Sequence, residues 1–208
     1  NIFSYVVSPK EKLILKLKKI VAVASNTYDF VFTSDRKFAF VPGQYMEWTL
    51  AHAYPDNRGN RRYFTVASSP SEKEVRLGLK FYSPASTFKQ SLANMKAGEV
   101  IVASQLSGDF VLPRNKERKL VFIAGGIGVT PFRSMIQHLL DQHESRPITL
   151  FYSNKTAAEI AYKDVFDRAA RELGVRTVYA LTDEPTPVPG TYAGPIDGRL
   201  ITRVVPDY

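Results

Sequence analysis

The spacing of apolar residues changes near Arg118, and this change divides the chain into two parts that must fold differently. Before it, short runs rich in β-branched and aromatic residues alternate with turn-forming residues, which is typical of a small antiparallel β-barrel. These runs are residues 13–23, 28–33, 45–50 and 75–82. One helix is predicted among them, at residues 87–95, because Thr87 and Gln90 have capping-box spacing.

From residue 118 onward, predicted strands and helices alternate. Residues 120–124 and 148–152 are apolar runs of strand length, and residues 177–181 form a third. Helical spacing of apolar residues follows the first run, and a second helix is predicted at residues 157–173. Residues 182–194 are rich in Pro, Thr and Gly and are predicted to form a loop. This alternation favours a parallel sheet built from βαβ units.

The predicted domains are therefore an antiparallel β-barrel over residues 1–113 and an α/β parallel-sheet domain over residues 119–208. The 208 residues include no cysteine, which excludes thiolate metal sites and cysteine nucleophiles, so redox chemistry would need a bound cofactor. No apolar stretch is long enough to span a bilayer. The chain begins at Asn1, and we expect it to be a piece of a longer protein.

A glycine-rich turn separates the first strand of the second part from its helix. It contains Gly125, Gly126 and Gly128 and is followed by Thr130 and Pro131. Glycines bring backbone amides close to a ligand, and a helix N-terminus attracts an anion. Thr130 is the expected helix cap, and Pro131 the expected first helical residue. The turn predicts a phosphate-binding loop, although it lacks the full G-x-G-x-x-G spacing and also suits a plain connection.

A second motif, Arg62-Tyr63-Phe64-Thr65, lies on a predicted strand. A flavin site needs a cation for phosphate, a flat side chain against the ring and a hydrogen-bonding group at the ring edge. Because side chains alternate along a strand, residues 62 and 64 point to one face and residues 63 and 65 to the other. A twist or bulge would have to bring them together. A strand with one exposed arginine is the alternative.

Together these motifs resemble the ferredoxin–NADP reductase family, in which a flavin-binding barrel, the FAD-binding FR-type domain, precedes a nicotinamide-binding domain. Four motifs of that family occur here in the family's order: the P-G-Q turn at residues 42–44, R-x-[YF]-[ST] at Arg62, Phe64 and Thr65, the phosphate-site hydroxyls at Ser86 and Thr87, and the G-x-F turn at residues 108–110. The resemblance implies an FAD-dependent oxidoreductase that moves a hydride from NAD(P)H to flavin.

The resemblance also implies a role for each matching residue. Arg62 would pair with flavin phosphate, Phe64 would pack on the isoalloxazine, and Thr65 would hydrogen-bond near its reactive nitrogen. Thr65 and Thr130 are the candidate catalytic residues, because hydride transfer requires positioned cofactors rather than a protein acid or base. The full implied cofactor-binding set is Arg62, Tyr63, Phe64, Thr65, Lys80, Phe81, Tyr82, Ser86, Thr87, Gly125, Gly126, Gly128, Thr130, Pro131, Ser153, Asn154 and Asp183.

The choice of cofactors rests on a few further residues. Residues 67–69 resemble the FAD-using members rather than the FMN-using ones. Asp183 and Glu184 would repel a 2′-phosphate and could accept a ribose hydroxyl, which favours NADH, whereas Lys155 favours NADPH. The three histidines have no metal-ligand spacing, and no metal site is predicted.

Family members continue with a further strand that these residues do not supply, so the nicotinamide domain is expected to be incomplete, with its final strand missing. A flavin-binding or partner-docking domain without nicotinamide turnover is therefore the alternative function. The expected partner is an electron-acceptor protein or a membrane redox module. Residues 1–7 precede a basic run and suit either a barrel strand or the end of a membrane segment. The expected location is the cytoplasm, either as a free protein or as the cytoplasmic domain of a membrane-anchored one. The net charge of +8 is not arranged as a nucleic-acid surface.

Overall fold

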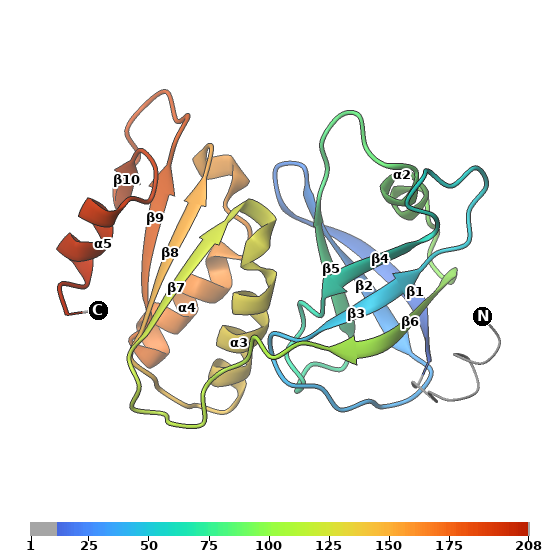
Figure 1. The fold of residues 1–208 in the computed structure, drawn as a ribbon, viewed down its shortest axis with the longest axis horizontal. Helices are drawn as coiled ribbons and strands as arrows, with labels where there is room; N and C mark the ends of the chain where they lie inside the picture. Colours follow the sequence, from blue (N-terminus) through green and yellow to red (C-terminus); the bar gives the residue numbers. More distant parts are fainter. Residues whose placement is uncertain (1–11, 208) are drawn as a thin grey trace.

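The structure, a computed structural model, describes residues 12–207 and has two domains joined by an extended linker (Figure 1). It confirms the predicted fold class, because a six-stranded antiparallel sheet precedes a four-stranded parallel sheet with helices. Residues 1–11, which include the proposed membrane-segment end, lie outside the described residues. Among the described helices, none is long and apolar enough to cross a membrane.

The first domain is a curled sheet with strand order β4-β3-β6-β1-β2-β5. Its elements are β1 (Leu13–Ala24), β2 (Thr27–Ser34), β3 (Tyr45–Thr49), β4 (Arg61–Thr65), β5 (Val75–Lys80), α2 (Thr87–Ala93) and β6 (Val100–Ser107). Leu13, Leu15 and Leu17 of β1 are buried while the residues between them are exposed, so one face of the strand supplies the core. Trp48 and Phe88 are fully buried in the same core.

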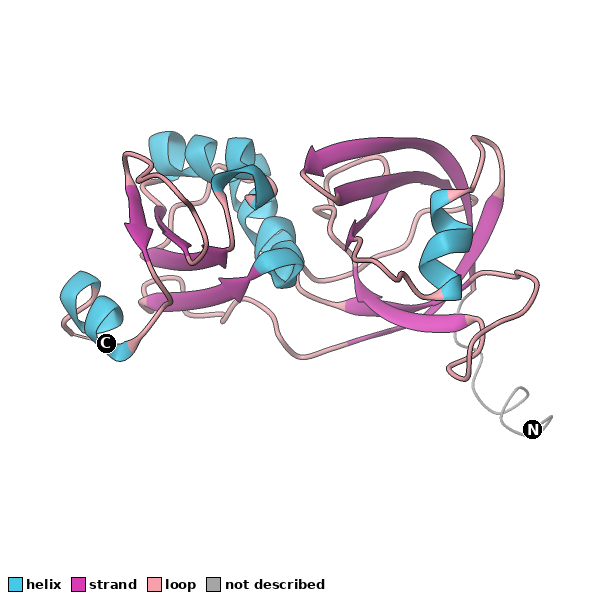
Figure 2. Ribbon diagram, turned by 90° about the horizontal axis from the view of Figure 1, so that it is seen from above, coloured by secondary structure: helices cyan, strands magenta, loops and turns pink. Residues whose placement is uncertain are grey.

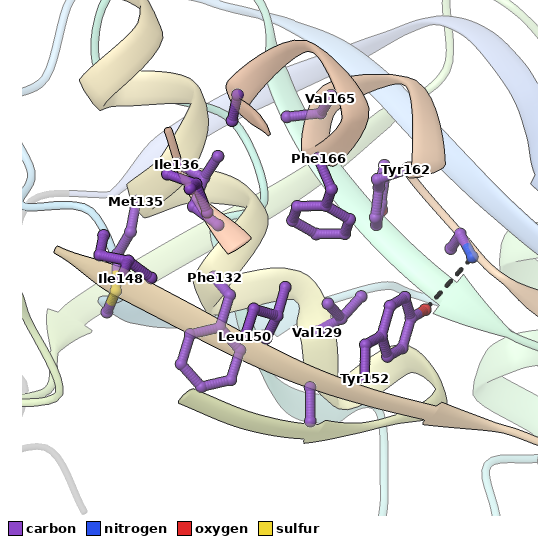
Figure 3. Close-up of a cluster of buried hydrophobic side chains, with 14 of the residues drawn as sticks. Val129, Phe132, Met135, Ile136, Ile148, Leu150, Tyr152, Tyr162, Val165 and Phe166 are labelled. Atoms are coloured by element: carbon purple, nitrogen blue, oxygen red, sulfur yellow. Dashed lines mark hydrogen bonds between the residues drawn. The ribbon is translucent and has the colours of Figure 1, made fainter. Parts of the chain in front are cut away.

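The second domain is a parallel sheet with strand order β10-β9-β8-β7. Its elements are β7 (Leu120–Gly125), η1 (Gly126–Val129), α3 (Thr130–Asp141), β8 (Ile148–Asn154), η2 (Ala157–Glu159), α4 (Lys163–Leu173), β9 (Arg176–Leu181), β10 (Thr191–Ala193) and α5 (Gly198–Val204). The helices α3 and α4 cover one face of the sheet, where Leu150 and Tyr152 of β8 are buried (Figure 3). The C-terminal helix α5 lies on the other side of the sheet (Figure 2). Phe151 of β8 packs there with Leu200 of α5.

Two predicted boundaries in the second domain are wrong. The helix expected at residues 157–173 is split, because Tyr162 has a φ of +58° and α4 begins only at Lys163. The loop expected at residues 182–194 contains β10, which pairs in parallel with β9. Both corrections reflect contacts between distant segments, which local spacing does not report.

Two helix starts also differ by one residue from the prediction. The N-cap of α2 is Ser86, whose hydroxyl accepts from the Lys89 N–H at 3.4 Å, while Thr87 is already helical. Thr130 is the first residue of α3 and is not its cap, because its hydroxyl donates backward to the Ile127 carbonyl at 3.2 Å. Pro131 is accordingly the second helical residue rather than the first.

Candidate functional site

A pocket of about 360 Å³ opens on the barrel where β3 begins and β4 ends, and it is lined by Tyr45, Tyr63, Phe64 and Thr65. The two strands are antiparallel with Tyr45 opposite Thr65, which is why residues 18 positions or more apart share the pocket. The rings of Tyr45 and Tyr63 meet edge to face at 5.9 Å. An opening with aromatic walls and a hydroxyl at its edge fits one end of a planar heterocycle.

Tyr45 is a pocket residue that the sequence prediction missed. It follows the P-G-Q turn directly, and this position next to a family motif is the signal in the sequence that could have identified it. Its ring packs on Gly108 of the G-x-F turn, where a β-carbon would lie 3.1 Å from the ring. Gly43 of the P-G-Q turn lies even closer to the G-x-F turn, since its β-carbon would lie 2.0 Å from the Phe110 carbonyl oxygen. The two turns therefore meet behind the pocket.

Arg62 and Phe64 lie together with the start of α2. The Arg62 guanidinium lies 5.3 Å from the centre of the Phe88 ring, and the Phe64 ring lies 5.9 Å from it. Phe88 follows Ser86 and Thr87 directly, so the structure brings four of the predicted residues to one corner of the barrel. Tyr63 points the other way, as strand alternation requires, and its hydroxyl donates to Glu47 at 2.9 Å.

Arg62 already has protein partners in this corner. One terminal nitrogen donates to both carboxylate oxygens of Asp56, at 2.7 and 2.9 Å, and the other donates to three backbone carbonyls of residues 58–61. The Asp56 N–H donates to the Thr87 hydroxyl at 3.0 Å. Asp56 thus contacts both the arginine and the helix start at which the sequence predicts phosphate.

Lys89, on the first turn of α2, is a second cation that the sequence prediction missed. Its ammonium donates to the Lys80 carbonyl at 2.5 Å and lies 5.7 Å from the Phe81 ring. Burial, followed by repulsion from Arg58, lowers the pKa of Lys89. Within residues 12–207, no carboxylate lies within ion-pair distance of Lys89. This uncompensated positive charge is what a bound phosphate would neutralise, so the corner fits the diphosphate of a flavin dinucleotide.

The structure separates the three residues predicted from the strand before α2. The Lys80 ammonium is buried and pairs with Glu159 of the second domain at 2.6 Å, so it is not directed at the flavin pocket. The Phe81 ring packs against the barrel core and Tyr28. Tyr82 is 60% exposed, so it is the one of these three side chains that is open to a ligand.

The nucleotide residues predicted in the second domain lie together at the carboxyl edge of its sheet. Gly125 ends β7 directly opposite Ser153 of β8, and Asp183 follows β9. A β-carbon on Gly125, Gly126 or Gly128 would meet no atom within 4 Å, so the turn faces open space. Only Gly126 has a positive φ, of 49°. Asn154 is buried at 5% exposure and is less accessible to a nucleotide than Ser153.

Thr130, the candidate catalytic residue of the second domain, reaches the barrel at Gly78 of β5. The connection from β4 to β5 is hairpin-like, since the Ala67 N–H donates to the Arg76 carbonyl at 2.9 Å. Ala67 lies two residues beyond Thr65, the last residue of β4. A β-carbon on Gly78 would lie 2.9 Å from the Thr130 methyl carbon, so Thr130 approaches β5 from the second domain.

The segment after Thr65 docks the second domain. The Ser68 carbonyl accepts from the Ser134 hydroxyl at 2.7 Å, and the Ser69 hydroxyl donates to Asp141 at 2.6 Å. Arg133 of α3 donates to the Ala67 carbonyl at 3.0 Å and forms an ion pair with Glu72. Residues 67–69, which the sequence associates with the choice of flavin, therefore also join the barrel to α3.

The remaining expectations concern metals and histidines. Among the described residues, no cluster of three or more His, Asp or Glu side chains could hold a metal ion. His52 lies near the α2 corner, where one ring nitrogen is 3.3 Å from the Thr87 hydroxyl and the ring meets Phe88 edge to face. His52 therefore lies beside the helix start at which the sequence predicts phosphate.

The fold, an antiparallel sheet followed by a parallel sheet with helices, matches the two-domain fold of the ferredoxin–NADP reductase type. Residues 122–206 match the family model of the oxidoreductase NAD-binding domain.

Known proteins with similar sequences or structures include reductases and flavohemoglobins. The reductase component of propane 2-monooxygenase from Mycolicibacterium goodii is 30% identical over 196 residues, which are 90% of this chain and 54% of that protein. A cytochrome P450 reductase from Amycolatopsis has a TM-score of 0.79 at 25% identity, covering 95% of this chain and 59% of the other. A flavohemoglobin from Malassezia yamatoensis, with bound FAD and heme, has a TM-score of 0.73 at 26% identity, covering 89% and 49%. The chain spans about half, or less, of the curated relatives it matches.

Proposed function

We propose that the chain is the FAD-binding and nicotinamide-binding module of a reductase that takes a hydride from NADH and passes electrons to a separate redox protein. The observation that carries the proposal is that Thr130 of the second domain approaches the barrel at Gly78 of β5, the strand to which Ala67, two residues after Thr65, is hydrogen-bonded. A flavin ring against Thr65 and a nicotinamide entering beside Thr130 would face each other there. Bound flavin would supply the acceptor for the hydride and the means to release electrons singly.

The residues of the chain would bind and orient the two cofactors. Arg62, Lys89 and the start of α2 would hold the flavin diphosphate, while Tyr45, Phe64 and Thr65 would hold the ring. The open glycine turn at residues 125–128 and the edge formed by Ser153 and Asp183 would hold the dinucleotide. Correct placement alone can supply a large part of the rate of such a reaction, because no proton has to move through the protein.

Preference for NADH is supported by the charge around Asp183. The Lys155 ammonium, the one feature that favours NADPH, lies 3.8 Å from the Asp183 carboxylate, and both side chains are more than half exposed. Glu184 accepts from the Ala157 N–H at 2.6 Å and so adds a second negative charge at this edge. A 2′-phosphate would meet a net negative group.

The electron acceptor is proposed to be another redox protein or domain. The relatives named above comprise the reductase component of an oxygenase, a cytochrome P450 reductase and a flavohemoglobin. The feature they share with this chain is the reductase fold, while their acceptors differ. The acceptor is thus proposed by class, as a heme or iron centre outside residues 1–208.

The test is to bind FAD to the purified chain and mix it anaerobically with NADH or NADPH. We expect a flavin absorbance spectrum that bleaches with either nucleotide, and faster with NADH. Flavin binding without bleaching would instead support the alternative, a flavin-carrying domain without nicotinamide turnover. A protein that binds no added FAD would contradict both functions.

A further inference from the structure

We propose that Tyr162 and Asp29 form a positioning pair, which sets Thr130 against the barrel at the point where the hydride would pass. The inference rests on the proposed function and deepens it. Tyr162 lies just before α4 in the second domain, and Asp29 lies on β2 of the barrel. The Tyr162 hydroxyl donates to the Asp29 carboxylate at 2.5 Å, and both side chains are almost fully buried.

The outer face of β5 is the surface on which this pair meets. Val75, Leu77 and Leu79 point into the barrel core, so the alternate residues Arg76, Gly78 and Lys80 point toward the second domain. Arg76 pairs with Asp29 at 3.3 Å and with Glu72 at 2.9 Å, and Lys80 pairs with Glu159. Between these charged contacts, Gly78 leaves a gap with no side chain.

Tyr162 fills that gap. A β-carbon on Gly78 would lie 2.2 Å from the Tyr162 hydroxyl oxygen and 3.2 Å from an Asp29 carboxylate oxygen, in addition to 2.9 Å from the Thr130 methyl carbon. The two contacts from the second domain, made by Tyr162 and Thr130, therefore share one small area of the barrel. Because both groups lie within 3 Å of the same point, loss of the Tyr162–Asp29 hydrogen bond would change the position of Thr130 against the barrel.

The backbone at Tyr162 supports a positional role. Its φ of +58° is a left-handed conformation that a bulky residue rarely adopts, at a cost of roughly 1–2 kcal/mol. This conformation interrupts the predicted helix at a residue whose ring packs in the core of the second domain and whose hydroxyl reaches Asp29. A strained residue that is held by a buried hydrogen bond to another domain indicates that its position matters more than local stability.

The test is the Tyr162→Phe variant, which removes the hydroxyl and keeps the ring. We expect the rate constant of anaerobic flavin reduction at saturating NADH to fall about tenfold, while the Kd for NADH and the bound FAD per chain change by less than about twofold. The charge-transfer absorbance of the nicotinamide–flavin complex should weaken. If the Tyr162 hydroxyl were only structural, its loss would lower the stability of the protein but would change neither the rate at saturating NADH nor this absorbance.

Tyr179→Phe is the matched control, because Tyr179 donates to Asp167 at 3.1 Å within the second domain. It also loses a tyrosine–aspartate hydrogen bond, here a partly buried one to α4, and it should keep the wild-type reduction rate. Asp29→Asn, which retains an acceptor for Tyr162, should slow reduction less than Tyr162→Phe. If Tyr162→Phe reduces flavin at the wild-type rate, or if Tyr179→Phe slows it equally, the positioning pair is overturned. A wild-type protein that NADH does not reduce would overturn the proposed function first, and the inference with it.

Discussion

Asp56 forms a bidentate ion pair with Arg62, whose terminal nitrogen lies 2.7 and 2.9 Å from the two carboxylate oxygens. Arg62 is the residue expected to meet the flavin phosphate, so a carboxylate and a phosphate would compete for the same guanidinium. Asp56 also donates its N–H to the Thr87 hydroxyl, which ties its loop to the start of α2. The loop and the cofactor phosphate are thus directed at one site.

Asp56→Asn should therefore strengthen FAD binding. The amide keeps an oxygen for the Arg58 N–H, which donates to Asp56 at 3.0 Å, but it removes the negative charge that occupies Arg62. We expect the Kd for FAD to fall about threefold or more, which corresponds to roughly 0.7 kcal/mol. Titration of the flavin-free protein measures it, with Asp35→Asn as the control, since Asp35 pairs with Arg36 on another surface. Weaker binding would show that Asp56 orients Arg62 for phosphate.

The two adjacent arginines should differ in their effect on the flavin. The Arg62 side chain is 11% exposed and lies beside α2. The Arg61 side chain projects from the opposite face of β4, is 62% exposed and lies 3.5 Å from Glu47 of β3. Arg62→Ala should raise the Kd for FAD at least tenfold, or about 1.4 kcal/mol, and Arg61→Ala less than about twofold. Equal effects in the same titration would mean that the predicted register of the motif is wrong.

Lys89→Met should weaken FAD binding without destabilising the flavin-free protein. Without a bound anion, burial and Arg58 lower the pKa of Lys89, so the folded protein disfavours the charged form, and removing it should not destabilise the flavin-free protein at neutral pH. With FAD, the same ammonium would meet phosphate, and its loss should raise the Kd about tenfold. Thermal unfolding and titration measure the two effects, with the exposed Lys96→Met as control. Unchanged FAD affinity would remove Lys89 from the site.

The sequence could predict those parts of the fold and site that are set within a few neighbouring residues. The strand Arg62-Tyr63-Phe64-Thr65, the glycine turn before α3 and the two-domain order all have short-range signals, and the fold class is confirmed. The predicted cofactor roles of these residues remain predictions.

The parts that were missed depend on contacts between distant segments. Tyr162 and Asp29 are 133 residues apart, and the left-handed backbone of Tyr162 precedes a helix that starts six residues later than expected. Lys89 lies outside every motif, and its environment depends on how α2 packs against residues 80–81. Asp56 belongs to a loop whose fold local propensity does not determine.

Asp183→Asn should shift the nucleotide preference toward NADPH. The substitution removes the charge that would repel a 2′-phosphate and leaves Lys155, now 3.8 Å from that carboxylate, to attract it. We expect the ratio of kcat/KM for NADH to that for NADPH to fall about tenfold. Adding Lys155→Gln should restore much of the original ratio. If neither substitution changes the ratio, the nucleotide phosphate binds elsewhere.

The domain interface should weaken in acid through Glu72. The Glu72 carboxylate accepts from Arg133, from the Ser69 N–H at 2.7 Å and from Arg76 at 2.9 Å. Burial alone would raise the pKa of Glu72, but Arg133, the Ser69 N–H and Arg76 together hold it below the ordinary value of 4.5. In the unfolded chain the carboxyl takes up a proton near 4.5, whereas in the folded protein it does so only at lower pH.

Glu72 therefore stabilises the folded protein fully above the ordinary value, and this contribution is lost as the pH falls through the lowered pKa. We expect the free energy of unfolding, measured by urea denaturation from about pH 6 to about pH 3, to decrease less steeply in Glu72→Gln than in the wild type. At neutral pH the variant should be less stable, because Arg133 would lose the charge that compensates it. Glu117→Gln, in the exposed linker, should follow the wild-type curve. Parallel pH dependence of the wild type and Glu72→Gln would show that the Arg133 ion pair contributes no pH-dependent stability to the interface.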